Sequence, residues 1–102
     1  MADNKSPNNA MQDQHKPREQ ILRELKEAGE KIEKGAQYAH YKHPEQPYTI
    51  YDFCVLEATD EICALYGPTD EPRIRFVRPV SVFLETVEWE GETLPRFRRV
   101  AS

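Results

Sequence analysis

Aromatic residues are missing from the N-terminal part of the chain: every Tyr, Phe and Trp lies between Tyr38 and Phe97. A segment without large apolar side chains buries too little surface to offset the entropy that is lost when it is ordered. Residues 1–16 consist mainly of Asn, Asp, Gln, Lys and Pro. We therefore predict a disordered tail over residues 1–16 and a packed domain over residues 35–102.

Long apolar runs are missing from the chain of 102 residues. No stretch approaches the roughly 18 to 20 residues of a membrane span, and the polar N-terminus lacks the apolar segment of a secretory signal peptide. An excess of basic residues is also missing, because 14 Lys and Arg stand against 18 Asp and Glu. This balance argues against the uniformly cationic surface of a non-specific DNA binder or a membrane-surface protein. We expect one small cytoplasmic domain that does not contact a membrane.

Motifs of common catalytic sites are absent as well. The four glycines are scattered, so neither a glycine-rich phosphate loop nor a Gly-x-Ser-x-Gly nucleophile turn occurs. Cys54, Cys63, His40 and His43 are of residue types that bind zinc, but their spacings match no common zinc motif. We expect two free thiols, no metal, no cofactor and no catalytic residue, because His40 has no second catalytic group at a recognisable spacing. The sequence leaves enzymatic activity open and favours a protein that is not an enzyme.

An amphipathic helix is predicted over residues 17–34. Its apolar residues recur at spacings of three and four and form one stripe: Ile21, Leu22, Leu25, Ala28 and Ile32. Pro17 suits the first helical position, and Gly35 suits the position just after the helix. We interpret the stripe as a surface that packs on the following domain; a partner-binding or self-associating helix is the alternative.

After Gly35 the apolar pattern changes to that of strands. Segments 48–56 and 61–67 are rich in β-branched and aromatic residues and flank a turn at 58–60, which predicts a hairpin. Under strict alternation both faces of 48–56 carry apolar residues, with Ile50 on one face and Phe53 on the other, which favours a barrel. Further along, the pattern predicts a third strand at 73–79, a helical turn or bend after Pro79, and a last hairpin turning at 90–92. The expected fold is mainly β: a small SH3-like or open β-barrel domain preceded by one amphipathic α-helix and a disordered N-terminal tail.

Lysine is absent after Lys42, and all later basic residues are arginines. Arginine suits bidentate contacts with carboxylate or phosphate, and stacking on aromatic rings. Two of these arginines, Arg78 in FVRP and Arg96 in LPRF, stand among core-forming residues. A cation at such a position is expected to be partly buried, and it then needs a partner, either an internal acid or a bound anion.

The segment YAHYK, residues 38–42, alternates in a way that is informative for a strand. Extended backbone would place Tyr38, His40 and Lys42 on one face and Tyr41 on the other. Tyr, His and Lys on one face supply hydrogen-bond donors, a group that titrates near neutral pH and a cation. The segment is therefore a candidate binding site, with an amphipathic structural strand as the alternative.

The motifs of the folded part occur in the order YAHYK, FVRPVSVFLETV and LPRF, with Tyr48 and Tyr66 between the first two. In this order the chain resembles the small bacterial family known as domain of unknown function 1653, over about residues 36–98. The chain differs from the family where a Gly normally follows HYK, because it has His43 and the short insertion 44–47. The resemblance implies a small, β-rich, barrel-like domain and no particular reaction.

Two functional hypotheses follow from these residues. In the first, the protein is a non-catalytic binding module whose shallow site takes an anionic group, either the phosphate of a nucleotide or nucleic acid, or a carboxylate. The residues assigned to this site are Tyr38, His40, Lys42, Arg78 and Arg96. In the second, the protein is a structural or protein-interaction domain that acts through the helix and the barrel edge, with the arginines as internal braces. The candidate partners are therefore an anionic small molecule, a nucleic acid, or a protein that contacts the helix.

Overall fold

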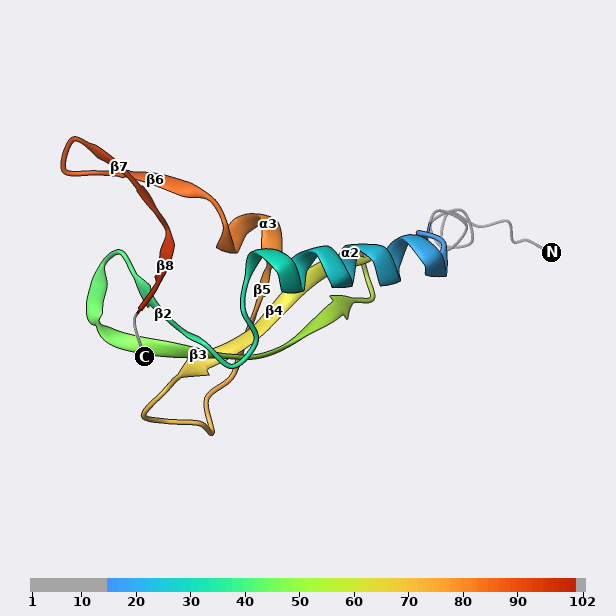
Figure 1. The fold of residues 1–102 in the computed structure, drawn as a ribbon, viewed down its shortest axis with the longest axis horizontal. Helices are drawn as coiled ribbons and strands as arrows, with labels where there is room; N and C mark the ends of the chain where they lie inside the picture. The colour runs from blue at the N-terminus through green and yellow to red at the C-terminus, as the bar shows by residue number, and fades with distance from the viewer. Residues whose placement is uncertain (1–14, 101–102) are drawn as a thin grey trace.

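The protein folds as an antiparallel sheet with helices over one side of it (Figure 1), in a computed structural model that describes residues 15–100. The elements in chain order are α2 (Arg18–Lys31), β2 (Gln37–His40), β3 (His43–Leu56), β4 (Glu61–Pro68), β5 (Phe76–Pro79), α3 (Val80–Phe83), β6 (Thr86–Trp89), β7 (Glu92–Pro95) and β8 (Phe97–Arg99). Five strands form the sheet in the order β5-β4-β3-β2-β8, and β6 pairs with β7 in a separate hairpin.

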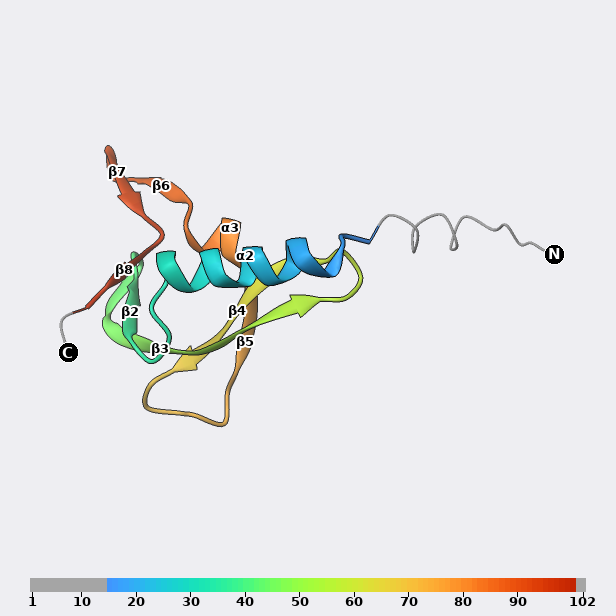
Figure 2. The same cartoon turned by 45° about the vertical axis from the view of Figure 1, so that its right-hand side comes forward.

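The sheet is open. Strands β5 and β8 are its two edges, and no ladder joins them within residues 15–100. Figure 2 shows the long strands β3 and β4 passing beneath α2 and α3. The structure confirms a mainly β fold with one helix ahead of the sheet, and it shows an open sheet in place of a closed barrel.

Helix α2 lies within the predicted segment 17–34 and ends before it. It begins after Pro17, whose carbonyl oxygen accepts the N–H groups of Gln20 and Ile21 at 3.0 and 3.1 Å. It ends at Lys31, because Ile32 adopts an extended conformation with φ −126° and its side chain is fully buried. Burial of this one side chain in the core therefore outweighs the helical pattern of the last residues.

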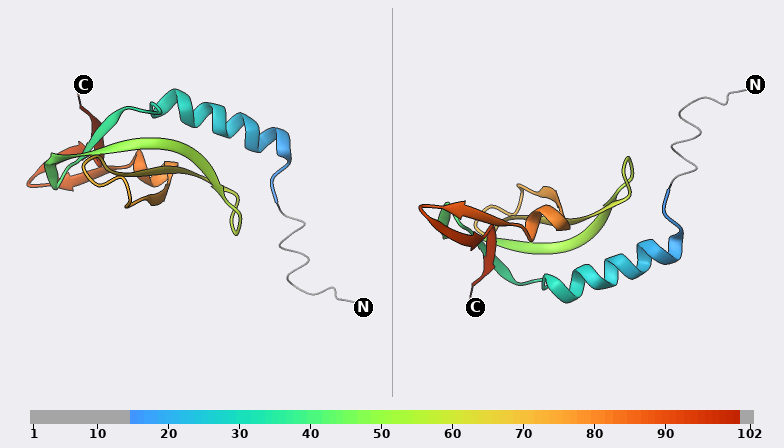
Figure 3. Two further views of the ribbon diagram at one scale, coloured as in Figure 1. Left: turned by 90° about the horizontal axis from the view of Figure 1, so that it is seen from below. Right: turned by 90° about the horizontal axis from the view of Figure 1, so that it is seen from above.

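The apolar stripe of α2 packs against the sheet, as the first interpretation proposed. Ala28 and Ile32 are buried and Leu25 is half-buried, whereas Leu22 is 59% exposed. Figure 3 shows α2 running beside β3. Most of the predicted tail, residues 1–14, lies outside the described residues.

The segment YAHYK does not form one continuous strand. Strand β2 ends at His40, and Tyr41 and Lys42 form the turn of a hairpin in which His40 pairs with His43. The expectation that Lys42 shares a strand face with Tyr38 and His40 is therefore wrong. The two-residue turn also explains why β3 begins at His43, earlier than the predicted strand.

A β-bulge in β3 changes which of its side chains share a face. Ile50 pairs with Tyr66 and Phe53 pairs with Ala64, and the register shifts between them. Since Tyr66 and Ala64 are two residues apart on β4, Ile50 and Phe53 lie on the same face of the sheet. Strict alternation had placed them on opposite faces, and the extra residue in the bulge is the reason for the difference.

Strand β5 is shorter than the predicted strand 73–79, because residues 69–75 form a loop that folds back on β4. A Cβ atom at Gly67 would collide with the carbonyl oxygen of Ile74, so glycine allows this close approach of the two backbones. After Pro79 the chain forms α3, which confirms the predicted helical turn. The last hairpin is also confirmed, with Glu90 and Gly91 at φ 53° and 84° in the turn between β6 and β7.

An aromatic cluster joins α3 to the sheet. Phe83 is 1% exposed, and its ring stacks on the ring of Phe97 with centroids 4.1 Å apart and planes 2° from parallel. The rings of Tyr38 and Tyr66 also contact Phe83, each at a centroid distance of 5.5 Å. Because these three partners belong to β8, β2 and β4, Phe83 connects α3 to three strands of the sheet.

We predict that Phe83→Ala lowers the free energy of unfolding by about 3–5 kcal/mol, because it removes a buried ring and leaves a cavity. Urea denaturation of both proteins measures the difference. Leu84→Ala is the matched control, because Leu84 is 42% exposed and its truncation should change stability by only about 0.5 kcal/mol. Equal losses for the two variants would contradict the role assigned to Phe83.

Candidate functional site

A pocket of about 360 Å³ takes its lining from all five strands of the sheet. The lining residues are His40, His43, Tyr48, Tyr66, Phe76, Val77, Arg78 and Phe97. The register explains this collection, because directly opposed residues share a face of a sheet: Phe76 is opposite Tyr66, and His40 is opposite both His43 and Phe97. No acidic side chain is among the lining residues, so the pocket combines aromatic rings and one aliphatic residue, Val77, with basic groups.

Arg78 is the cation of this pocket. Its Nε donates a hydrogen bond to the hydroxyl of Tyr66 at 3.0 Å, and its guanidinium carbon lies 5.3 Å from the centre of the Phe97 ring. The side chain is half-buried, and within residues 15–100 no carboxylate forms an ion pair with it. A partly buried cation without an acid is a ready partner for a bound anion.

Tyr66 supplies a hydroxyl group next to Arg78. Its ring is buried among the rings of Tyr48, Phe76, Phe83 and Phe97. Burial raises the pKa of Tyr66 above its ordinary value, and the nearby charge of Arg78 opposes this effect only in part. The phenol therefore keeps its proton at neutral pH, and the hydroxyl can donate to a ligand while it accepts from Arg78.

His40 is a neutral imidazole with a defined tautomer. Its Nδ1 accepts the backbone N–H of Lys42 at 3.1 Å, which assigns the single ring proton to Nε2. Burial lowers the pKa of His40, and the positive charge of Arg78 lowers it further. The ring of His43 lies beside it, with centroids 6.3 Å apart. His40 thus offers an N–H donor without adding another charge.

The structure brings together two of the predicted site residues, His40 and Arg78, and places Arg96 outside the pocket lining. Arg96 forms an ion pair with Glu85 at 3.0 Å, and its backbone N–H donates to the Glu85 carbonyl oxygen at 2.8 Å. Its Nε is buried without a hydrogen-bond partner, and its charge is close enough to lower the pKa of His40 to a smaller extent than Arg78 does. Arg96 therefore has the internal acid that Arg78 lacks.

Tyr38 and Lys42 also lie outside the pocket lining. Tyr38 is buried, and its hydroxyl accepts the backbone N–H of Glu33 at 3.1 Å, just after α2 ends. Lys42 extends from the hairpin turn toward the rings of Tyr41 and Trp89, with its Nζ 5.9 Å from each ring centre. Both residues have contacts elsewhere that account for their positions.

Six lining residues were not among the predicted site residues: His43, Tyr48, Tyr66, Phe76, Val77 and Phe97. One sequence signal pointed to His43, because a two-residue turn within H-x2-H places the two histidines opposite each other in a hairpin. For Phe76 and Phe97 no local signal exists, since their strands lie at opposite edges of the sheet.

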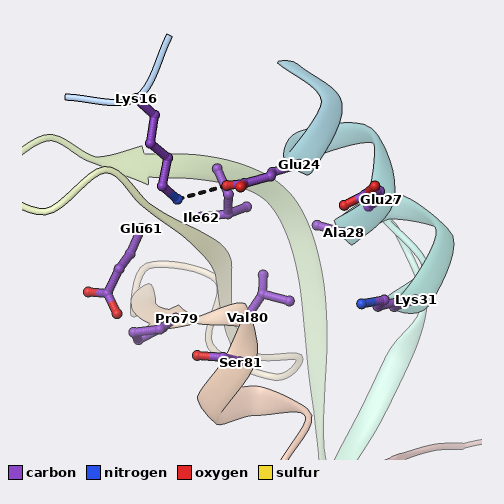
Figure 4. A pocket seen from close by; sticks show the side chains of 10 residues that line it. All are labelled: Lys16, Glu24, Glu27, Ala28, Lys31, Glu61, Ile62, Pro79, Val80 and Ser81. Carbon is purple, nitrogen blue, oxygen red and sulfur yellow. Dashed lines mark hydrogen bonds and ion pairs between the residues drawn. The ribbon is translucent and has the colours of Figure 1, made fainter. Parts of the chain in front are cut away.

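A second hollow of about 300 Å³ lies between α2, β4 and α3 (Figure 4). Its walls carry charges of both signs, and Lys16 and Glu24 are paired at 2.7 Å. Lys31 on α2 and Glu61 on β4 also line it. Because these opposite charges offset one another, the hollow has no clear preference for a ligand of one charge.

Metal ligands do not gather within residues 15–100, where no group of three or more His, Cys, Asp and Glu residues is arranged to hold an ion. Cys54 and Cys63 are free thiols directly opposite each other on β3 and β4. Burial raises the pKa of Cys63, which keeps this thiol protonated. None of the helices described in this part of the chain has the length and apolar character needed to cross a membrane.

The family model described as Protein of unknown function (DUF1653) matches residues 36–99. The chain belongs to this family. The match confirms the resemblance predicted over about residues 36–98, and no curated protein and no solved structure matches the chain. All the pocket residues fall within the DUF1653 segment, whereas α2 precedes it.

We predict that acidification destabilises this DUF1653 protein in part through His40. The pKa of His40 is lower in the folded chain than its ordinary value of 6.5, which applies in the unfolded chain. Between these two pKa values the unfolded chain therefore binds more protons than the folded one. The free energy of unfolding therefore rises with pH across this interval and falls on acidification. His40→Gln keeps a hydrogen-bond acceptor and does not titrate, so it should lose less stability than the wild type between about pH 7.5 and about pH 5.5.

Urea denaturation at the two pH values measures this difference. If the free energy of unfolding falls equally in the wild type and in His40→Gln, then His40 takes up a proton as readily in the folded chain as in the unfolded chain.

Proposed function

We propose that the protein is a non-catalytic binding module that holds an anionic group against Arg78. One observation carries the proposal: Arg78 is partly buried in a pocket without acidic lining residues, and within residues 15–100 the hydrogen-bond partner of its guanidinium is a neutral phenol. The whole chain has a net charge of −4, whereas no acidic residue is in the lining of this pocket. An anion at this position would supply the partner that a partly buried cation needs.

Three residues of the pocket lining carry hydrogen-bond donors for the proposed anion. Arg78 has guanidinium N–H groups that are not used in its bond to Tyr66, and Tyr66 and His40 add an O–H and an N–H. Charge-assisted hydrogen bonds of this kind are among the stronger polar contacts in proteins. The lining contains no carboxylate, thiol or aliphatic hydroxyl that could serve as a nucleophile or orient His40 as a base. The composition of the pocket therefore supports binding over catalysis.

A protein-interaction role through the edge of the sheet is the second candidate. Ile74, Phe76 and Val77 are exposed on β5 and on the loop before it, and β5 is an edge strand. The helix gives this role less support, because Ala28 and Ile32 are already buried against the sheet.

We further propose that the module acts in the bacterial cytoplasm, as the composition and the family resemblance predict. Cys54 and Cys63 support this location. They are directly opposed free thiols, and thiols so placed stay reduced most readily in a reducing compartment.

The anion site is tested by NMR titration of the backbone amides with three probes: inorganic phosphate, phenyl phosphate and benzoate. We predict that at least one probe shifts the amides of His40, Phe76 and Arg78, and that Arg78→Met weakens its binding about tenfold or more. Methionine keeps the aliphatic packing of the arginine stem and removes the charge. Arg78→Lys keeps a positive charge without the planar guanidinium. Its affinity for the probe should therefore lie between those of Arg78→Met and the wild type.

Arg73→Met is the matched control, because Arg73 is an exposed arginine whose guanidinium pairs with Glu71 at 2.8 Å. It should bind the probes as the wild type does. The amide spectrum and the urea midpoint establish that each variant is folded. If a folded Arg78→Met variant binds the probes as tightly as the wild type, or if no probe shifts the pocket amides, the anion site is refuted.

A further inference from the structure

The rim of the Arg78 pocket is aromatic, and it is not fully covered by the protein. Phe76 is 44% exposed, although its ring lies 5.8 Å from the buried ring of Tyr66. Tyr48 is half-buried, and His43 is exposed beside His40. Exposed aromatic rings next to a cation provide surfaces on which a flat, electron-rich group can stack.

The spacing of Phe76 and Arg78 relates this rim to the anion position. The two residues are two apart on β5, so their side chains share a face, with Cα atoms about 7 Å apart along the strand. A ligand held by both therefore needs an anionic group and a flat ring separated by a short linker. A nucleotide has this arrangement, since one ribose separates its phosphate from its base.

The donors around the anion position favour phosphate over carboxylate. Arg78, Tyr66 and His40 belong to three different strands, β5, β4 and β2, and all three line the pocket. A carboxylate has two oxygen atoms in one plane, whereas a terminal phosphate presents three oxygen atoms in a pyramid. The phosphate can therefore accept from all three side chains at once.

The size and charge of the site limit the ligand to one nucleotide. A volume of about 360 Å³ is at the low end of the range for small-molecule sites. A long nucleic acid needs a row of cations along its backbone, whereas this chain has a net charge of −4 and Arg73, Arg96 and Arg99 are paired with glutamates.

Building on the proposed anion site, we propose that its ligand is a single nucleotide unit, with the phosphate bound by Arg78, Tyr66 and His40 and the base stacked on Phe76 and Tyr48. The unit has two sources, a free mononucleotide or the 5′-phosphorylated end of a nucleic-acid strand. Both present the same chemistry to the pocket.

The proposal is tested by calorimetric titration with AMP, UMP, ribose 5-phosphate and adenosine. We predict that AMP binds the wild type about tenfold more tightly than ribose 5-phosphate, because the base adds a stacking contact. Adenosine should bind more weakly than AMP, because it lacks the phosphate. Phe76→Leu should weaken the binding of AMP more than that of ribose 5-phosphate, so that the ratio of the two affinities falls toward one.

Trp89→Leu is the matched control, because Trp89 is an aromatic residue of similar exposure, 38%, that lies outside the pocket lining. This variant should retain the full ratio. Equal affinities of the wild type for AMP and ribose 5-phosphate would overturn the nucleotide inference and leave the phosphate site standing. Binding of benzoate or of an acidic peptide in preference to AMP would overturn it in favour of a carboxylate. If none of the phosphate compounds binds, the anion site itself fails.

The two sources are separated by tetranucleotides with and without a 5′-phosphate. Tighter binding of the phosphorylated tetranucleotide than of AMP assigns the site to strand ends, and weaker binding assigns it to the free nucleotide. If both tetranucleotides bind more tightly than AMP and equally tightly, the terminal phosphate is not recognised and the proposal is overturned.

Discussion

The stack of Phe83 on Phe97 determines where two weakly structured parts of the chain lie. Phe83 comes from a helix of four residues, and Phe97 comes from a strand of three residues whose one neighbour within residues 15–100 is β2. Elements this short are not stable by themselves, so burial of the two rings has to hold them in place. The β6–β7 hairpin lies between Phe83 and Phe97 in the sequence, so the stack holds the chain on both sides of the hairpin, and Trp89 adds a contact with the ring of Tyr41 at a centroid distance of 5.3 Å.

The proposed binding pocket depends on this cluster as well. Tyr66 contacts Phe83 and Phe97 with its ring and accepts the Arg78 hydrogen bond with its hydroxyl, so one residue belongs to both the core and the site. A rigid core thereby limits where the guanidinium can lie. The pocket also lowers the stability of the free protein, because Arg78 is partly buried there and no acid within residues 15–100 pairs with it. Local features that lower stability without an internal compensation are typical of functional sites.

The two embedded arginines show how far a prediction from sequence extends. FVRP and LPRF look alike locally, and both predict a partly buried cation that needs a partner. Glu85 supplies that partner for Arg96, and no acid within residues 15–100 supplies it for Arg78. The acid of Arg96 is local, because the β6–β7 hairpin pairs Thr86 with Pro95 and so brings the next two residues, Glu85 and Arg96, together. The surroundings of Arg78 depend on strands from the whole sheet, and the spacing of residues along the chain does not give them.

Local patterns determined the kind of element, and tertiary contacts determined where several elements end and which side chains meet. Periodicity in the sequence was enough to predict α2, the β3–β4 hairpin, the helical turn after Pro79 and the last hairpin, because these depend on residues close together in the chain. The end of α2 at Lys31 and the turn at Lys42 were decided by contacts beyond the local pattern, since burial of the Ile32 side chain or closure of one hairpin outweighs a weak local preference. The pocket belongs to the tertiary structure for the same reason: Arg78 and Phe97 come from opposite edges of the sheet, and only the fold of the whole domain brings them within 5.3 Å.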